Sequence, residues 1–128
     1  MKLPRPFIRL PLLFDAGVLA AEIDALGEGV WRDHPQKFPG NSMLPLLAVG
    51  GDPANESFAG AMAPTPELLR CPYLVQVMAS FGATLGRTRL MRLAGQAEVT
   101  PHVDQGYYWA ERVRVHVPIV TQPTVRFE

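Results

Sequence analysis

The stretch TPHVDQGYYWAERVRVHVPIV, residues 100–120, determines the expected fold because it joins a close pair of metal-ligating side chains to a segment typical of a β-strand. A strand directs residues i and i+2 to the same face, about 6.6 Å apart along the chain. His102 and Asp104 have this spacing. Their imidazole and carboxylate can therefore converge on one metal ion, and the pair predicts two ligands of a metal site.

The polarity of the segment that follows alternates with a period of two, which predicts a strand over residues 112–120. One face carries Arg112, Arg114 and His116, and the other carries valines and then Ile119. An ordinary strand with one face in water shows the same pattern. Beside a candidate Fe(II) ligand pair, however, a row of arginines suits a dicarboxylate such as 2-oxoglutarate, because a guanidinium is a planar fork that matches a carboxylate.

Further motifs extend this pattern toward the N-terminus. In chain order the set is Trp31, residues 40–60, residues 64–74, residues 89–93, Gly95, His102, Asp104, Arg114, His116, Pro118, Thr121 and Pro123. This ordered set resembles the aspartyl/asparaginyl β-hydroxylase family of Fe(II)- and 2-oxoglutarate-dependent dioxygenases. The resemblance covers the chain from about Phe14 onward. It is more specific than the histidine and aspartate pair alone, which is a weak motif.

The resemblance implies an α+β fold in which N-terminal helices pack on a double-stranded β-helix, a jelly-roll or cupin-like sheet pair that is incomplete in this chain. It also implies that His102 and Asp104 bind Fe(II), and that Arg114 and His116 hold the carboxylates of 2-oxoglutarate. Enzymes of this kind complete the metal site with a second histidine. The family's distal histidine, and the arginine about ten residues beyond it, would lie on later strands than those expected in this chain, and the remaining His34 stands where the family places no ligand.

The same resemblance gives the domain organisation. We expect one partial dioxygenase domain over residues 1–128, with helical and loop support over about 1–86 and the first jelly-roll strands over about 87–128. A jelly roll needs about eight strands, so we expect the chain to be the N-terminal part of a longer enzyme and to be inactive alone. A natural minidomain or a decayed gene are the alternatives. Such a fragment is expected to associate through unpaired strand edges.

The expected reaction is hydroxylation of an amino-acid or peptidyl side chain of the Asp/Asn type, with O2 as co-reactant. Tyr107, Tyr108 and Trp109 are candidate substrate contacts, although packing against further strands would bury the same rings. Two rival hypotheses stay open. In one, the chain is a non-catalytic β-sandwich binding module. In the other, His102, Asp104 and His116 bind zinc, which the cationic Arg114 beside them disfavours.

The overall composition excludes some classes of partner. Lys plus Arg and Asp plus Glu both number 12, so the net charge is zero and neither a nucleic-acid surface nor an anionic membrane is indicated. Hydrophobic residues make up 48%, enough for a globular core. The lone Cys71 is expected to be buried, which suits a reducing cytoplasm. The apolar run LPLLF, residues 10–14, is shorter than the apolar core of a secretory signal, which has about 7 to 15 residues.

The first half of the chain predicts one helix and a loop-rich region. Asp15 is a candidate N-cap for a helix over residues 16–26, whose apolar stripe ends before Gly27. Residues 33–66 are rich in proline and glycine, with a short strand expected at residues 44–47. Asn41 and Ser42, also in that region, are interpreted either as lining an entrance or as turn residues.

The second half predicts helices followed by strands. Thr65 before Pro66 is typical of an N-cap. Apolar residues at helical spacing predict a helix over residues 74–85 that Gly86 ends, with Tyr73, Met78 and Phe81 in the core. Strands are then expected over residues 88–93 and 97–103, joined by a turn at 94–96.

Overall fold

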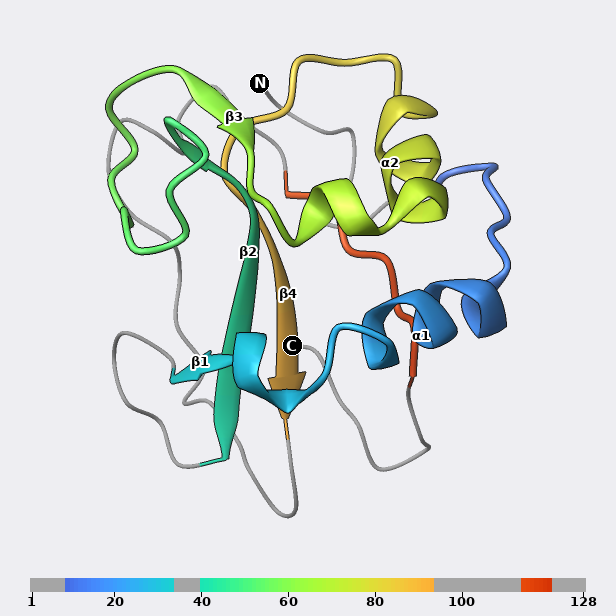
Figure 1. Ribbon diagram of the computed structural model, residues 1–128. Helices are drawn as coiled ribbons and strands as arrows, with labels where there is room; N and C mark the ends of the chain where they lie inside the picture. Colours follow the sequence, from blue (N-terminus) through green and yellow to red (C-terminus); the bar gives the residue numbers. More distant parts are fainter. Residues whose placement is uncertain (1–8, 34–39, 94–113, 121–128) are drawn as a thin grey trace.

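A computed structural model describes residues 9–33, 40–93 and 114–120 of the chain (Figure 1). In chain order the elements are the helix α1 (Ala16–Asp24), the 3-10 turn η1 (Glu28–Val30), the strands β1 (Arg32–Asp33), β2 (Asn41–Val49) and β3 (Met62–Pro64), the 3-10 turn η2 (Leu68–Arg70), the helix α2 (Pro72–Ala79) and the strand β4 (Thr88–Leu93). These elements form a small α+β domain with two α-helices and a four-stranded antiparallel sheet. The expected α+β class is confirmed in this form.

Strand β2 is the centre of the sheet, because the other three strands all pair with it. Strand β4 runs along one edge of β2, while β1 and β3 pair with opposite ends of its other edge. All of these pairings are antiparallel. The sequence predicts only a short strand here, whereas β2 spans nine residues, Asn41–Val49.

A proline in the middle of a central strand needs an explanation, because proline has no N–H to donate to the sheet. On one edge of β2 the pairings with β1 and β3 leave out Pro45, and on the other edge the register with β4 shifts just after it, between Pro45 and Leu47. The carbonyl of Pro45 accepts a hydrogen bond from Thr65 Oγ1 at 2.8 Å, in the buried interior. Thr65 therefore links the start of the helical layer to the central strand.

The helices lie together on one side of the sheet (Figure 1). The core between the two layers is made of side chains from both, with η2 and the Cys71 junction contributing as well. Its buried members are Leu19, Ile23, Leu26, Leu44, Leu46, Leu68, Cys71, Leu74, Val77, Met78 and Leu90. Burial of these side chains is the main stabilising term of the fold.

Helix α1 begins as the sequence predicts. The side chain of Asp15 accepts a hydrogen bond from the backbone N–H of Val18 at 3.1 Å, which satisfies one of the donors left open at a helix start. The helix ends at Asp24, and Gly27 takes a positive φ of 82° just beyond it. The predicted helix over residues 16–26 is therefore confirmed at its start but is shorter at its end, and Leu26 is buried just beyond the helix.

The two helices are held together by hydrogen bonds that run in both directions. Glu22 of α1 accepts from the backbone N–H groups of Tyr73 and Leu74, at 2.8 and 2.9 Å, in the first turn of α2. In return, the Tyr73 hydroxyl accepts from the backbone N–H of Asp15 at 2.8 Å. Because Cys71 offers α2 no side-chain cap, the carboxylate of Glu22 takes that role from a neighbouring helix.

Helix α2 is shorter than predicted. It ends at Ala79, and Gly82 turns the chain with φ +61°, so the prediction that the helix reaches Leu85 and ends at Gly86 is wrong. The apolar spacing continues because Phe81 and Leu85 still pack against the core from an irregular segment. Tertiary packing alone therefore explains the periodicity there. The core assignment of Tyr73, Met78 and Phe81 is confirmed.

The predicted strand over residues 112–120 is also wrong in its described part, because residues 114–120 form no strand. Both edges of the central strand β2 are already occupied, and Pro118 has no N–H to give to a ladder. Val117 and Ile119 nevertheless pack against the helix-side core, as expected of the apolar face. Val115, expected on the same face, is 48% exposed.

The two polar residues that the sequence assigns to a turn or an entrance belong to strand β2. Asn41 and Ser42 lie within β2, in neither a turn nor an entrance loop, and Asn41 is buried. Within the described part of the chain, neither helix has the length and apolarity that crossing a membrane requires.

Candidate functional site

Most of the predicted site lies outside the described residues. This holds for His102 and Asp104, the candidate Fe(II) ligands, and for Tyr107, Tyr108 and Trp109, the candidate substrate contacts. The turn and strand expected over residues 94–103 lie there as well. The metal site therefore stays a prediction from the sequence.

The two candidate 2-oxoglutarate residues are within the described part. Arg114 and His116 are both exposed, on the irregular segment 114–120, and both take part in interactions within the fold. Val117 and Ile119 on the same segment pack against the core. This packing attaches the segment to the helical layer, so Arg114 and His116 are held near it without belonging to a sheet.

The described residues alone do not form a metal site of side-chain ligands. Within ranges 9–33, 40–93 and 114–120, no group of three or more His, Cys, Asp or Glu side chains lies close enough to hold an ion. A site that uses His102 and Asp104 requires residues beyond these ranges. The same holds for the zinc set that adds His116, because His102 and Asp104 belong to it.

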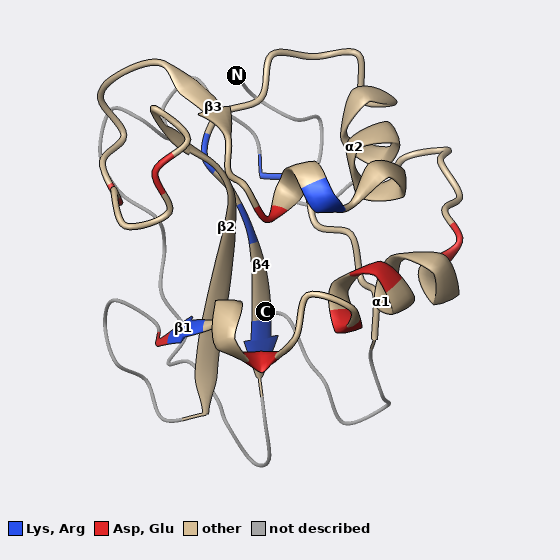
Figure 2. Cartoon of the chain, viewed as in Figure 1, with Lys and Arg blue, Asp and Glu red and all other residues tan. Residues whose placement is uncertain are grey.

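A cluster of charged and aromatic side chains fixes the end of β4 to the sheet and to η1. The guanidinium of Arg92 lies 4.2 Å from the centre of the Trp31 ring and donates to Glu28 at 2.7 Å. Its Nε donates to the Ser42 hydroxyl at 3.1 Å. Figure 2 shows the resulting pair of opposite charges at the tip of β4. Because the carboxylate of Glu28 is 82% exposed, we assign this cluster a local structural role.

The opposite face of the sheet carries a different set of side chains. Leu44 and Leu90 face each other across β2 and β4, and both belong to the helix-side core. Side chains alternate along a strand, so their neighbours Met43, Arg89 and Met91 lie on the far face. Met43 is only 1% exposed and yet lies outside the helix-side core.

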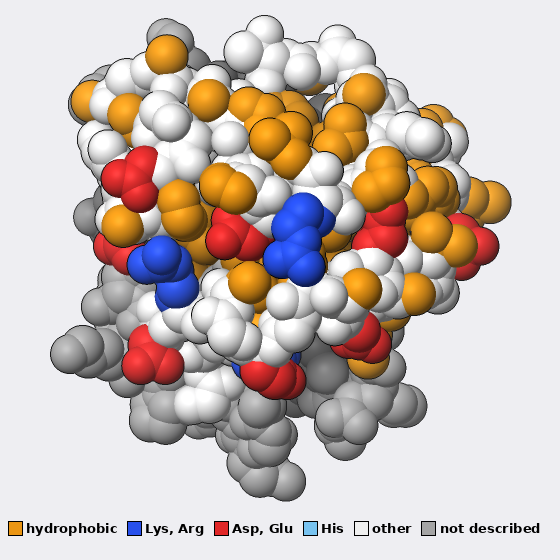
Figure 3. All heavy atoms as spheres, viewed as in Figure 1, with side chains coloured by type: hydrophobic (Ala, Val, Ile, Leu, Met, Phe, Trp, Pro, Cys, Tyr) orange, Lys and Arg blue, Asp and Glu red, His pale blue; other side chains and the backbone are white. Residues whose placement is uncertain are grey.

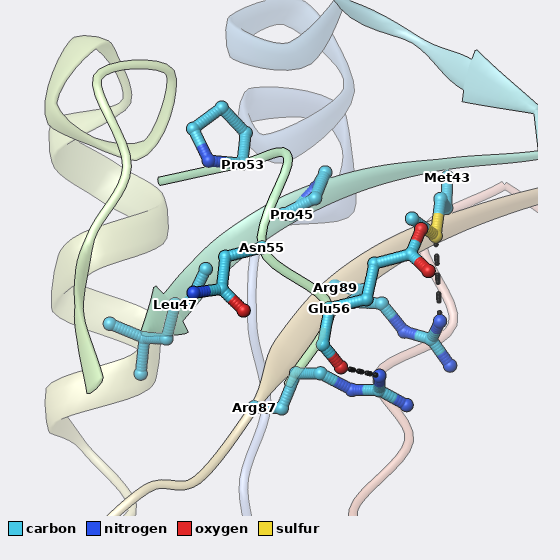
Figure 4. A pocket seen from close by; sticks show the side chains of 9 residues that line it. Met43, Pro45, Leu47, Pro53, Asn55, Glu56, Arg87 and Arg89 are labelled. Carbon is cyan, nitrogen blue, oxygen red and sulfur yellow. Dashed lines mark hydrogen bonds between the residues drawn. The ribbon is translucent and has the colours of Figure 1, made fainter. Parts of the chain in front are cut away.

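A small hollow opens on this far face, between the sheet and the loop that links β2 to β3 (Figure 4). The strand side supplies an apolar floor and the loop supplies polar groups. Its lining residues are Met43, Pro45, Leu47, Ala48, Pro53, Asn55, Glu56, Arg87 and Arg89. The cavity volume is about 10 Å³, which is room for about one water molecule.

The two arginines of the hollow are held in place by the residues around them. Arg87 Nη1 donates to the backbone carbonyl of Glu56 at 3.2 Å, and its guanidinium lies 4.1 Å from the centre of the Phe58 ring. Arg89 Nη1 lies 3.4 Å from Met43 Sδ. In Figure 4 both guanidinium groups extend to the same side of β4. The hollow therefore combines two fixed cations, one carboxylate and an apolar floor.

The described residues contain one thiol, that of Cys71, and its burial makes it unreactive. Cys71 is 0% exposed at the junction of η2 and α2, with Sγ 3.9 Å from the carbonyl of Glu22. Burial raises the pKa of the thiol, and the nearby Glu22 carboxylate raises it further, while Arg70 acts in the opposite direction. The thiol is therefore held in its neutral form, and the expectation of a buried cysteine is confirmed.

Comparisons of the chain with protein-family models, with curated proteins and with solved structures gave no match.

The hollow was not predicted from the sequence. Glu56 lies in a region that the composition predicts to be rich in loops, Arg89 is interpreted only as part of a family motif, and Arg87 is assigned no role. A signal was present in the run RTRLMRL, residues 87–93, where the alternation places Arg89, Met91 and Leu93 on one face and Leu90 on the other. The contact with Glu56 depends on how the loop after β2 folds over the sheet, and no local sequence pattern indicates it.

Proposed function

We propose that this chain is part of an Fe(II)- and 2-oxoglutarate-dependent dioxygenase that hydroxylates an amino-acid or peptidyl side chain of the Asp/Asn type. The observation that carries the proposal is the ordered pair His102 and Asp104 followed by Arg114 and His116. The α+β architecture, with helices on one face of an antiparallel sheet, supports it at the level of fold class. The double-stranded β-helix of this enzyme class is the finer fold that we propose.

In this proposal, His102 and Asp104 hold the iron while Arg114 and His116 orient the cosubstrate. Imidazole and carboxylate are suitable Fe(II) ligands, and arginine suits a carboxylate. When bound, Fe(II) and 2-oxoglutarate supply the oxidising power to insert one oxygen atom of O2 into a C–H bond, with succinate and CO2 as the other products. The chain's own residues bind and orient these groups. A cytoplasmic location, with no nucleic-acid or membrane partner, belongs to the same proposal.

Metal binding is the first test. Mn(II) replaces Fe(II) as a redox-stable probe, and its electron paramagnetic resonance signal is followed as the chain is titrated. We expect binding that is lost in Asp104→Ala and His102→Ala. The matched control is Asp24→Ala, which removes an exposed carboxylate at the end of α1. Equal binding by the wild-type chain and all three variants would contradict the proposal.

Turnover is the second test, and it depends on the reading frame. The source nucleic acid is sequenced downstream of codon 128, and the longest frame that contains the chain is expressed. The proposal predicts a further histidine followed by an arginine in that frame. It also predicts conversion of 2-oxoglutarate to succinate that requires Fe(II) and stops in Asp104→Ala. Full turnover by Asp104→Ala would eliminate the assignment.

The non-catalytic binding module remains the second candidate function. It predicts that neither the chain nor a longer product binds Fe(II) or Mn(II). The same titration therefore decides between the two candidates. A zinc site is distinguished by adding Zn(II) in competition, since it predicts that zinc binds but that 2-oxoglutarate is not consumed.

A further inference from the structure

The segment formed by residues 114–120 is attached to the fold mainly by side chains of one kind. It runs along the helix side of the sheet, in red in Figure 1, without forming a strand. Val117 and Ile119 are half-buried against the helix-side core, whereas Val115 and Val120 are 48% and 83% exposed. Two apolar side chains therefore anchor the segment to the helical layer, which consists of α1, η2 and α2.

The proline between the two anchors explains why both reach the core. Pro118 fixes its own φ and biases the residue before it, Val117, toward extended backbone. In extended backbone, residues two positions apart point to the same side, so Val117 and Ile119 pack on the core together. Among the described residues, no backbone hydrogen bond outside the helices and strands involves residues 117–120. Apolar contact therefore attaches this half of the segment to the described fold.

The other half of the segment carries the two exposed polar side chains. Arg114 and His116 both take part in interactions within the fold. His116 comes directly before the anchor Val117, and Arg114 is three positions before it. Because the chain joins these residues so closely, a movement of the anchors also moves Arg114 and His116. Docking of the segment is therefore coupled to whatever these two side chains bind.

The core does not depend on the segment. All of its fully buried members come from the helices, η2, Cys71, Leu26 and the sheet, and the segment only packs against it from outside. The alternating polarity of residues 112–120 is typical of a strand, so the irregular conformation of the described part goes against its local preference. Segments with few buried apolar contacts open at a lower free energy than the whole domain unfolds.

We propose that residues 114–120 are a strap that docks on the helical layer through Val117 and Ile119, and that opens from it while the rest of the domain stays folded. Opening moves Arg114 and His116 out of their docked positions. A role of the strap in binding 2-oxoglutarate rests on the proposed function, whereas the opening itself does not. In that role the docked strap is the binding form, because docking fixes both side chains in advance.

Thiol labelling under native conditions tests the opening, because a covered thiol reacts with an aromatic disulfide reagent only when its surroundings open. Val117→Cys places a thiol at one anchor, and the native Cys71, which is 0% exposed, reports unfolding of the core in the same molecule. We expect the thiol of Val117→Cys to react at least about tenfold faster than Cys71. Its rate should stay constant in low urea, whereas the Cys71 rate should rise with urea.

Three further variants distinguish opening from partial exposure. Leu47→Cys is the matched control, because Leu47 is also half-buried against the core but lies in the central strand β2, and it should react more slowly than Val117→Cys. Within the Val117→Cys chain, Ile119→Ala should speed labelling about tenfold, because it removes the second anchor. Val115→Ala shortens an exposed side chain of the same segment and should change the rate less than about twofold.

Any of three results would overturn the inference. The first is that the thiols of Val117→Cys and Cys71 react at rates that rise together with urea. The second is equal labelling of Val117→Cys and Leu47→Cys, and the third is a rate that Ile119→Ala leaves unchanged. Circular dichroism shows whether each variant folds, and Ile119→Cys, with Val117→Ala as its partner change, replaces the first reporter if Val117→Cys does not.

Adding 2-oxoglutarate with Mn(II) tests the link to the proposed function separately. Labelling of Val117→Cys should slow, because the ligand stabilises the docked strap, and Arg114→Gln should abolish this slowing. Arg32→Gln, which removes an exposed arginine on β1, is the control and should keep the slowing. If the strap opens but the ligand leaves the rate unchanged, the proposed role of Arg114 fails while the strap stands. If Val117→Cys reacts only with global unfolding, the strap fails, and the metal-binding test above still decides the proposed function.

Discussion

The two faces of the sheet differ in how they are closed. The helix face is covered by apolar side chains from α1, η2 and α2, and its residues Leu44 and Leu90 are nearly inaccessible. The far face combines the buried Met43 with Arg89, and with Met91 and Leu93, which are 49% and 51% exposed. The first face provides packing energy and the second provides accessible charge. Stability and binding are therefore expected to respond to different substitutions.

Figure 3 shows the side of the molecule seen in Figure 1, where apolar side chains are spread among charged ones. Acidic side chains appear at more places in this view than basic ones, although the whole chain has a net charge of zero. The two arginines and the one carboxylate that line the hollow are a local feature of the far face.

The largest expected effect comes from the helix face. Leu44→Ala should lower the free energy of unfolding by about 2 to 5 kcal/mol, because it leaves a cavity in a packed core. The matched far-face variant is Met91→Ala on the paired strand, where a loss below about 1 kcal/mol is expected. Urea denaturation measures both. Equal losses would show that the far face is packed as firmly as the helix face.

The second effect concerns the hydrogen bonds between the helices. Glu22→Ala should lower the free energy of unfolding by about 1 to 3 kcal/mol, because two backbone N–H groups of α2 lose their carboxylate acceptor. Asp24→Ala, an exposed carboxylate on the same helix, is the control and should change stability by about 0.5 kcal/mol or less. Thermal or urea unfolding followed by circular dichroism provides the measurement. A loss in the control equal to that of Glu22→Ala would mean that general charge on α1 is responsible.

The third effect is a pH dependence that arises in the helix-face core. Because the pKa of Cys71 is raised in the folded state, the unfolded chain releases the thiol proton first as pH rises. Stability should therefore fall above the ordinary thiol pKa of 9.0, by at most about 1.4 kcal/mol per pH unit. Cys71→Ala should remove this component of the alkaline loss. If the free energy of unfolding falls equally with pH in the wild-type chain and in Cys71→Ala from pH 8 upward, the thiol does not contribute to the loss.

Local features of the fold were predictable from the sequence, whereas the pairing of strands in the sheet was not. The Asp15 cap and the strand β4, Thr88–Leu93, follow from residues within a few positions of each other, and both are confirmed. The length of β2 was missed because Pro45 interrupts its pattern, and Pro45 is tolerated because the pairings with β1 and β3 leave it out. The predicted strand over residues 112–120 is wrong in its described part, because alternating polarity along a segment does not provide a free strand edge for it to pair with.

The candidate functional residues likewise include some that the sequence predicts and some that it does not. Arg114 and His116 were chosen from a spacing motif, and the structure places both on an exposed, irregular segment. The hollow with Arg89 and Glu56 was not predicted, because it depends on the loop after β2 reaching the face of β4. A contact between segments more than thirty positions apart leaves no local pattern to find.

The position of β2 in the sheet also has a consequence for synthesis on the ribosome. Its edge next to β4 pairs with residues far along the chain, since the Ser42 and Arg92 side chains that meet there are 50 positions apart. The chain must therefore emerge almost to the end of β4 before that edge is covered. Until then the nascent chain carries an open apolar strand, and slow elongation over residues 50–90 would prolong its exposure to chaperones and to neighbouring nascent chains.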